Sequence, residues 1–303
     1  MAYFLNTFFL SLPETCTTLL VTLAITMIFK TSYTTNFAQG TISAFGAYVV
    51  SAAVAKLGLP IWISIPLGML VSMLMAVAID VVIFRNGRYV NALSKQIITM
   101  GLISVILGAI PLIFGISDYN FNSFVTGDQT IKLLDGTVAT IQNNALVCIA
   151  ITAVVIVLIF ILLNFSKWGL AVRATASNEY IAGMMGINTH VITAISWGLA
   201  GALGVLAASL YLSSGSKVNG YFMTPFQVNA FLAGILGGFS TFHGPVIAAF
   251  LICFTNNLII CMCHYMGNDD LGKWSTVIIY ALAITIIFFK PQGIFGKKIA
   301  KKV

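Results

Sequence analysis

The sequence predicts an all-α polytopic membrane protein with eight to nine transmembrane helices. Of its 303 residues, 59% are hydrophobic and 8% are charged, and the mean hydropathy is +1.01. Soluble proteins contain roughly 25% charged residues, so this composition indicates a chain surrounded mainly by lipid. Backbone groups inside a bilayer must be paired within the protein, and long unbroken apolar runs favour helices over the alternating strands of a barrel.

The spans follow from the apolar runs and from the turn residues between them. Ser11-Leu-Pro-Glu14 has the pattern of a capping box with an early proline and predicts the start of the first span. Residues 222–235 are apolar but short, so they predict either a crossing or a re-entrant helix, which gives nine or eight spans. The predicted spans are residues 11–29, 36–55, 61–84, 96–115, 145–163, 191–212, 222–235, 246–264 and 275–289.

Two segments rich in glycine and small polar residues, 36–46 and 236–245, interrupt this pattern at membrane depth. Such segments let a helix start late or break inside the bilayer. Two interpretations of the first segment stay open: it is part of the path of a solute, or it is a site of tight helix packing that touches no solute. The candidate path residues are Asn36, Phe37, Gln39, Gly40, Ser43, Gly46, Gly237, Gly238, Ser240 and Gly244.

The whole chain, 1–303, is predicted to be a single transmembrane domain with two polar excursions. Residues 117–144 are expected to form a small external cap, with Asp135-Gly136 as the turn of a hairpin. The cap either contacts an external protein or is an inert loop. Residues 167–188 carry charges on a segment whose composition favours helix.

The distribution of basic residues orients these segments. The net charge of +7 allows a nucleic-acid partner, but the basic residues lie at span ends and in the tail 290–302. Membrane lipid is therefore the expected partner of these charges, and no nucleic acid is expected. Nine spans with the tail inside leave four basic residues outside, Lys56, Lys132, Lys217 and Lys273. The cytoplasmic ones are Lys30, Arg85, Arg88, Lys95, Lys167, Arg173, Lys290, Lys297, Lys298, Lys301 and Lys302. This excess predicts that residues 167–188 are cytoplasmic.

The sequence carries no catalytic pattern. Residues 267–273 resemble a phosphate-binding loop, but Trp274 stands where a hydroxyl residue would meet magnesium, and the strand-to-helix setting is missing. The cluster of Cys261, Cys263 and His264 lacks a second ligand pair at a recognised spacing, so neither a metal nor a cofactor is expected. The chain is therefore predicted to be no enzyme, and ATP hydrolysis, where needed, comes from other subunits.

A set of ordered motifs resembles the branched-chain amino acid permeases of ABC importers. It comprises Asn36-Phe-Ala-Gln-Gly40, Gly169-Leu-Ala-Val-Arg-Ala174 followed by Asn178 and Met185-Gly-Ile-Asn188, Leu236-Gly-Gly238 with Gly244-Pro245, and Lys290-Pro-Gln-Gly-Ile294. The similarity runs from about Leu12 to Gly296. Each motif is weak alone, and the order and spacing of the set carry the resemblance.

The resemblance implies a multi-pass permease of the bacterial inner (cytoplasmic) membrane. It implies four kinds of partner: a second homologous permease subunit, two cytoplasmic ABC ATPase subunits, an external or periplasmic solute-binding protein, and membrane lipid. It also implies that residues 167–188 form the loop that couples the permease to the ATPase. The coupling residues are Gly169, Leu170, Arg173, Ala174, Asn178, Glu179, Ala182, Met185, Gly186 and Ile187.

Alternatives to this assignment stay open. The family often has histidine where Gln39 stands and a charged residue where Asn178 stands, so a urea or short-chain amide permease is an alternative to a branched-chain amino acid permease. A passive channel and a non-catalytic membrane scaffold are rivals of other classes. An amphipathic helix on the lipid surface is the alternative for residues 167–188, although the segment has few basic residues.

Overall fold

The computed structural model describes residues 2–85, 91–115, 119–132 and 138–296. The predicted turn at Asp135-Gly136, the basic residue Arg88 and the last part of the basic tail, residues 297–302, lie outside the described residues.

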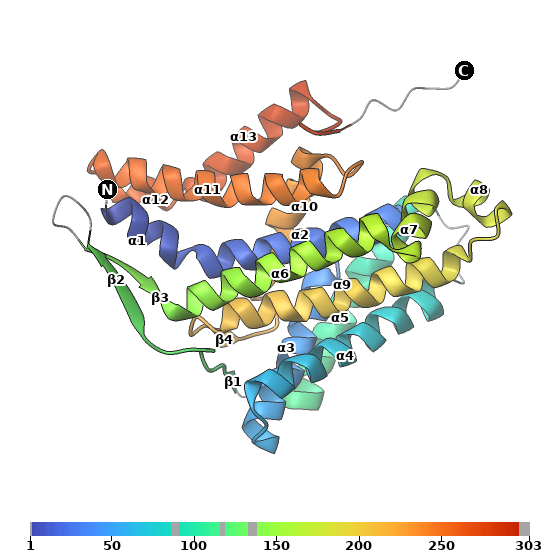
Figure 1. Ribbon diagram of the computed structural model, residues 1–303, viewed down its shortest axis with the longest axis horizontal. Coiled ribbons are helices and arrows are strands. Elements are labelled where there is room, and N and C mark those ends of the chain that lie inside the picture. Colours follow the sequence, from blue (N-terminus) through green and yellow to red (C-terminus); the bar gives the residue numbers. More distant parts are fainter. Residues whose placement is uncertain (1, 86–90, 116–118, 133–137, 297–303) are drawn as a thin grey trace.

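The described chain is mainly helical, which confirms the predicted fold class (Figure 1). The helices are α1 (Ala2–Leu10), α2 (Leu12–Ser32), α3 (Gln39–Leu57), α4 (Ile61–Ile79) with the π-helical turn η1 (Asp80–Phe84), α5 (Ala92–Phe114), α6 (Asn143–Phe165), α7 (Lys167–Ser177), α8 (Glu179–Met184), α9 (Thr189–Leu212), α10 (Thr224–Gly237), α11 (His243–Tyr265), α12 (Asp269–Gly272) and α13 (Ser275–Phe289). The strands are β1 (Tyr119–Asn120), β2 (Asp128–Lys132), β3 (Val138–Gln142) and β4 (Lys217–Val218).

Within the described residues, seven helices are long and apolar enough to cross a membrane. They are α2, α3, α4 with η1, α5, α6, α9 and α11. The 14 residues of α10 and the 15 residues of α13 give lengths of about 21 and 22 Å, short of the hydrocarbon thickness of about 30 Å. Seven of the predicted spans are therefore long helices, and the other two, α10 and α13, are shorter than the hydrocarbon layer.

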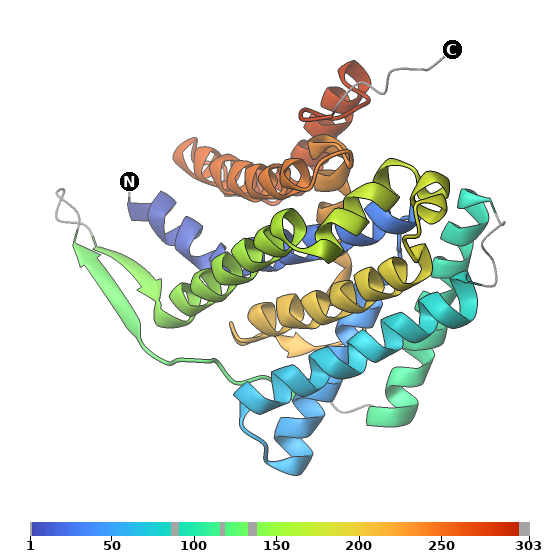
Figure 2. The same ribbon diagram turned by 45° about the vertical axis from the view of Figure 1, so that its right-hand side comes forward.

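The two ends of the bundle differ in structure and in charge. The N-terminus and the β2–β3 hairpin lie at one end, and α7 and α8 lie at the other, as Figures 1 and 2 both show. Four basic residues predicted to be cytoplasmic line cavities beside α7 and α8: Lys30, Arg85, Lys95 and Arg173. His243 at the start of α11 lines one of these cavities, whereas β4 pairs with β1 at the other end. The chain therefore passes from one end to the other through α10, as the nine-span arrangement requires.

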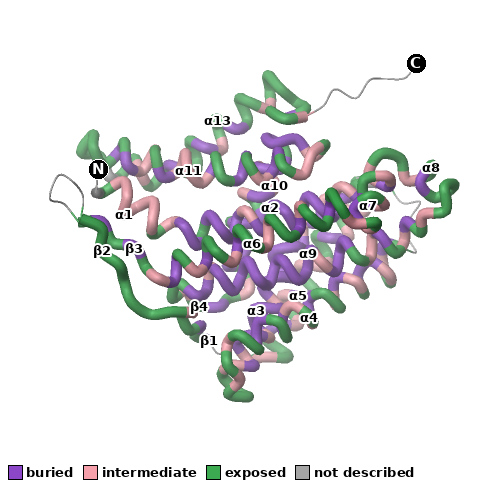
Figure 3. The backbone as a smooth tube through the Cα atoms, in the orientation of Figure 1, coloured by how far each residue is buried: buried purple, intermediate pink, exposed green. Residues whose placement is uncertain are grey.

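The core is centred on α2 and α9, which Figure 3 shows as largely buried. Three threonine hydroxyls of α2, those of Thr18, Thr22 and Thr26, donate hydrogen bonds to the carbonyl four residues earlier, at 2.6–2.9 Å. Thr17 also donates to the Ala207 carbonyl of α9 at 3.1 Å. Because the hydroxyls are paired with backbone, a threonine-rich helix can be buried among apolar neighbours.

Glycines allow α3, α4 and α9 to approach closely. A Cβ atom on Gly46 would lie 2.1 Å from Val205 Cγ2, and one on Gly201 would lie 2.6 Å from the Ser72 carbonyl oxygen. At the α7–α8 end the ring of Trp197, which is fully buried, stacks on Phe84 of η1 with 5.0 Å between ring centroids. The small residues of α3 and α9 therefore serve close helix packing.

The polar segment 117–144 forms short strands at the N-terminal end. The predicted hairpin is confirmed by the antiparallel pairing of β2 with β3. It packs against α1, where the Thr140 amide donates to Asn6 Oδ1 at 2.8 Å. The predicted capping box at Ser11 is wrong: its backbone is helical, and its hydroxyl donates to the Phe8 carbonyl at 2.9 Å. Because α1 runs almost directly into α2, Ser11 closes the last turn of α1 instead of capping α2.

A bulky substitution at Gly201 is expected to destabilise the protein. Gly201→Leu should lower the free energy of unfolding by about 1–3 kcal/mol, because the added side chain meets backbone of α4. The matched control is Gly108→Leu on α5, where an added Cβ has no heavy atom within 4 Å. The apparent midpoint of thermal unfolding in detergent checks this, and an equal loss in both variants would contradict the packing role.

Candidate functional site

The first interruption of the helical pattern lies between α2 and α3. The structure places it at residues 33–38, at the front of the predicted segment 36–46, and α3 begins at Gln39. Tyr33 ends α2 with a left-handed backbone conformation, φ 49°, and its amide donates to the Phe29 carbonyl at 2.9 Å. The α2–α3 connection (residues 33–38) is therefore non-helical backbone inside a membrane protein, and its polar groups need other partners.

Three amide side chains supply partners for this connection and the first turn of α3. The Asn36 side chain accepts from the Ala38 amide at 3.0 Å and donates to Gln39 Oε1 at 3.2 Å. Gln39 Nε2 donates to the Ala200 carbonyl of α9 at 2.8 Å. Gln227 of α10 accepts a hydrogen bond from the Gly40 amide and donates to the Phe37 carbonyl at 2.5 Å. The network fixes the start of α3 between α9 and α10.

The predicted path residues of this segment are enclosed by that network. Asn36, Gln39 and Ser43 are fully buried. Gly40 faces Gln227 so closely that an added Cβ would lie 2.5 Å from Gln227 Oε1. In the described conformation, these residues contact protein, and contact with a solute requires α3 to separate from α9 or α10.

The second interruption lies between α10 and α11. Residues 238–242, the α10–α11 connection, pack against the segment that follows α13. The Ile294 amide donates to the Leu236 carbonyl at 2.6 Å. Gly238 has φ +80°, and a Cβ there would lie 2.7 Å from the Gln292 carbonyl oxygen. The glycines of the predicted path segment thus permit a close contact with the C-terminal segment.

The two interruptions occupy different depths. Gln227, whose side chain forms hydrogen bonds with the backbone at the first interruption, lies in the first turn of α10. Gly237, at the second interruption, is the last residue of that helix. At 1.5 Å per residue, about 15 Å of helix separates the two positions. The structure therefore does not gather the predicted path residues into one cavity.

The segment 167–188 is helical, with its helix ends set by side chains. Ser166 caps α7 by accepting from the Gly169 amide at 2.9 Å, and Asn178 caps α8 by accepting from the Ile181 amide at 3.1 Å. Gly186 ends α8 with φ +86°, a conformation that glycine adopts without strain. Gly169 permits the sharp corner after α6, since a Cβ there would lie 2.3 Å from the Leu163 carbonyl oxygen.

This segment exposes an apolar surface at the end of the bundle. Met185 is 79% exposed. The other exposed apolar side chains of α7 and α8 are Leu170, Tyr180, Ile181 and Met184. Of the remaining predicted coupling residues, Arg173, Asn178 and Gly186 are exposed, Ala174, Glu179 and Ile187 are half-buried, and Gly169 and Ala182 are buried. The buried residues pack the two short helices against the bundle, and the exposed ones leave an uncovered apolar surface.

Tyr33 joins this surface to the α2–α3 connection. Its hydroxyl donates a hydrogen bond to the Ala176 carbonyl of α7. Partial burial raises the pKa of Tyr33, and the negative charge of Glu179 raises it further. The phenol is therefore protonated at neutral pH and remains a donor. Sequence reasoning missed Tyr33 because only the fold brings α7 beside it.

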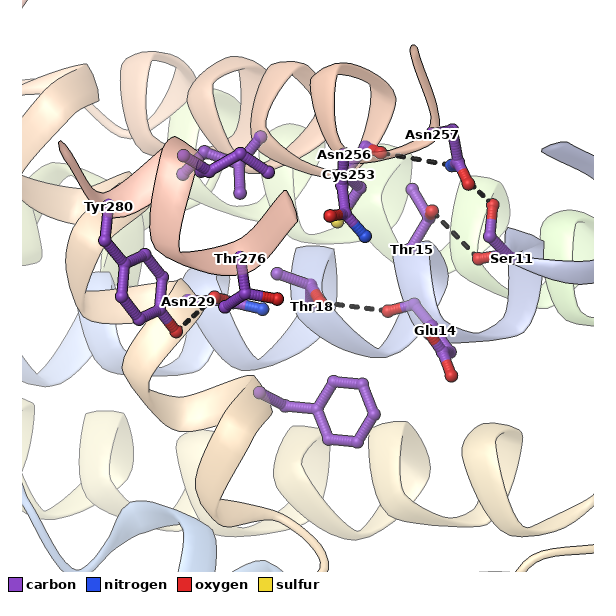
Figure 4. Close-up of a pocket in the computed structure, with 13 residues that line it drawn as sticks. Ser11, Glu14, Thr15, Thr18, Asn229, Cys253, Asn256, Asn257, Thr276 and Tyr280 are labelled. Carbon is purple, nitrogen blue, oxygen red and sulfur yellow. Dashed lines mark hydrogen bonds between the residues drawn. The ribbon is translucent and has the colours of Figure 1, made fainter. Parts of the chain in front are cut away.

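A polar cavity of about 60 Å³ lies between α2, α10, α11 and α13 (Figure 4). Glu14, Asn229 and Asn256 line it, and the Tyr280 hydroxyl donates to Asn229 Oδ1 at 2.9 Å. Within the described residues, the Asn256 Oδ1 atom is buried without a hydrogen-bond partner. The cavity has room for a few waters or for the polar end of a small molecule. Sequence reasoning missed it, although Asn256-Asn257 within an apolar run was a visible signal.

Comparisons with known proteins give one consistent family. The family model described as "Branched-chain amino acid transport system / permease component" matches residues 8–287. The permease protein LivH of the high-affinity branched-chain amino acid transport system of Salmonella typhimurium is 25% identical, and the match covers 99% of this chain and 98% of LivH. BraD, the corresponding permease protein of Pseudomonas aeruginosa, is 23% identical, with 94% and 93% covered.

Two further matches are more distant. The ribose import permease protein RbsC of Haemophilus influenzae is 25% identical, and the match covers 82% of this chain and 74% of RbsC. The solved structure described as "PsaBC from Streptococcus pneumoniae in complex with Fab" has a TM-score of 0.54 at 15% identity and covers 96% of this chain. At that identity, the second match supports the fold alone.

Removal of the Gln227 side chain is expected to destabilise the start of α3. Gln227→Ala should lower the free energy of unfolding by about 1–3 kcal/mol, because the buried Gly40 amide loses its acceptor. Gln129→Ala is the matched control, since Gln129 is exposed on β2. Thermal unfolding of both variants in detergent checks this, and a Gln227→Ala protein as stable as the control would show that the network contributes nothing.

Proposed function

The chain belongs to the family of permease components of branched-chain amino acid transport systems, and we propose that it is the transmembrane subunit of an ATP-binding-cassette importer for a small polar solute. The observation that carries the proposal is the family match over residues 8–287. Branched-chain amino acids are the proposed solutes. Urea and short-chain amides are the alternative, because Gln39 and Asn178 depart from the family pattern.

The proposed assembly contains two permease subunits, two ATPase subunits on the cytoplasmic side and an external solute-binding protein, in the cytoplasmic membrane. The ATPase is placed at the α7–α8 end, where the basic residues collect. The binding protein is placed at the end that carries the β2–β3 hairpin. The sequence carries no nucleotide site, so the driving force is proposed to reach the chain through contact with the ATPase.

Residues 167–188 are proposed as the coupling segment. The exposed apolar side chains of α7 and α8 form a surface that fits a cleft, and Arg173 and Asn178 stand at its rim. The hydrogen bond from Tyr33 to the Ala176 carbonyl then connects α7 with the α2–α3 connection. A displacement of α7 by the ATPase is proposed to move this connection and, through it, the start of α3.

The path of the solute is proposed to open along α3 and toward the polar cavity. Gln39 and Ser43 become accessible when α3 separates from α9 and α10. Gly237, Gly238, Ser240 and Gly244 form the cytoplasmic end of the proposed path, from the last residue of α10 onward. The polar cavity beside α2 offers carboxylate and amide oxygens to an ammonium group. This arrangement suits a zwitterionic solute, for which an apolar channel has no partner.

Reconstituted transport tests the assignment. The permease with its ATPase and binding protein in proteoliposomes is expected to take up leucine only with ATP. Met185→Asp should weaken ATPase binding by about thirty-fold and abolish uptake, because it places a charge in an apolar contact worth about 2 kcal/mol. Met266→Asp is the matched control for ATPase binding, since Met266 is 74% exposed and follows α11 at the opposite end.

Two results would contradict the assignment. Leucine uptake that persists without ATPase subunits would favour a passive channel. Full uptake and normal ATPase binding by the Met185→Asp variant would show that the segment at Met185 does not couple the permease to the ATPase.

Accessibility of Ser43 tests the proposed path. In a background in which the five native cysteines are replaced, Ser43→Cys should react with a water-soluble maleimide during ATP-driven turnover and remain unreactive at rest. Ser209→Cys on α9 is the control, because Ser209 is equally buried in the core. If both cysteine variants react during turnover, or neither does, residues 36–46 are better explained by tight helix packing than by a solute path.

A further inference from the structure

A large cavity separates α7 from the α10–α11 connection at the α7–α8 end. Its volume is about 590 Å³. Its walls come from four parts of the chain: Lys30 of α2, Phe160 and Leu163 of α6, Arg173 of α7, and Phe242 and His243 at the start of α11. The cavity shares Arg173 with the proposed coupling segment and Ser240 with the proposed path, but most of its walls belong to neither.

The charged side chains that line the cavity, among the described residues, are those of Lys30 and Arg173, and both are positive. The imidazole of His243 lines it as well. Lys30 Nζ donates to the Ser240 carbonyl and lies 5.1 Å from the centre of the Phe242 ring. Arg173 donates from Nη2 to the Asn164 carbonyl at 3.3 Å. A guanidinium has five N–H donors, so this bond leaves donors for an anion.

The depth of the cavity follows from the helix ends around it. The spans α2 and α6 end nearby, at Ser32 and Phe165, and α11 begins at His243. Three membrane-spanning helices thus end at the cavity, which puts it at the level of the lipid headgroups rather than in the aqueous layer beyond. Phe160 and Leu163 make one wall apolar.

The outer face of α6 continues that apolar wall along the membrane. Its exposed side chains include Leu158, Ile161 and Phe165. An occupant with a negative head and an apolar chain matches both parts of this surface. The cytoplasmic leaflet is rich in lipids of that kind, and basic pockets between spans on that side suit their headgroups.

We propose that this cavity binds the phosphate headgroup of an anionic phospholipid from the cytoplasmic leaflet. The guanidinium of Arg173 forms a bidentate contact with the phosphate, and the ammonium of Lys30 contributes a point charge. His243 approaches from the start of α11. Because these residues belong to α7, α2 and α11, a bound phosphate joins α7 to two spans and restrains the proposed coupling segment.

Lipid retention by the full-length permease, without ATPase subunits, tests the proposal. Native mass spectrometry with phosphatidylglycerol and phosphatidylcholine as the probes should show selective retention of phosphatidylglycerol. The double variant Lys30→Gln/His243→Gln should weaken that retention by about thirty-fold. The control Lys56→Gln/Lys217→Gln removes two basic groups from the opposite end and should retain the lipid.

The arms of the experiment separate the possible occupants. If inorganic phosphate displaces phosphatidylglycerol at millimolar concentration, the cavity is a site for free anions, and the lipid proposal is overturned. Displacement by purified ATPase subunits, with the double variant weakening ATPase binding instead, would show an acidic protein partner and also overturn it. Equal retention by the double variant and wild type would remove the site altogether.

A further variant, Arg173→Lys, serves as a control for misfolding of the double variant. Arg173→Lys keeps the charge and loses the bidentate geometry, so it should weaken retention of phosphatidylglycerol by less than the double variant does, with unchanged thermal unfolding. The measurement needs neither ATP nor solute. A negative lipid-retention result therefore does not contradict the proposed transport function, and a negative transport result does not contradict the lipid site.

Discussion

The pairing of backbone polar groups at the α2–α3 connection is the constraint on which the rest of the structure depends. Residues 33–38 leave helical geometry inside a bundle, where water is scarce and unpaired amides are costly. Asn36, Gln39 and Gln227 supply the partners. Since Gln227 and the Ala200 carbonyl belong to α10 and α9, satisfying this short connection fixes the positions of three helices at once.

The C-terminal turn of α2 extends that constraint to the rest of the molecule. Phe29 stacks on Phe239 of the α10–α11 connection with 4.2 Å between ring centroids, and Lys30 donates to the Ser240 carbonyl. Tyr33 donates to α7. One helix end therefore contacts both non-helical connections and the exposed α7–α8 segment, so a displacement of α7 has a direct physical route to the start of α3.

The two ends of the bundle divide the chemistry between them. At the α7–α8 end, Lys30 and Arg173 line one cavity, and their charge matches an anionic leaflet. A second cavity there is lined by Arg85 and Lys95 together with Asp80 and Glu179. Toward the other end, α2, α10, α11 and α13 enclose uncharged amides, hydroxyls and Glu14. The polar cavity proposed for the solute belongs to the second set, and the proposed lipid and ATPase contacts use the first. The cytoplasmic end of the proposed path meets the first set at Ser240, which lines the basic cavity.

The sequence by itself determined the membrane class, the places of the apolar spans, seven of which are long helices, the β2–β3 pairing and the helical character of residues 167–188, because these depend on local composition and period. The tertiary structure decided which groups meet. Gln227 pairs with Gly40 across 187 positions, and no local pattern encodes such a partner. The same holds for Tyr33 with α7 and for the four-helix cavity at Asn256. Ser11 shows the reverse case: its pattern suggested a cap, but α1 and α2 follow each other so closely that the hydroxyl bonds within α1.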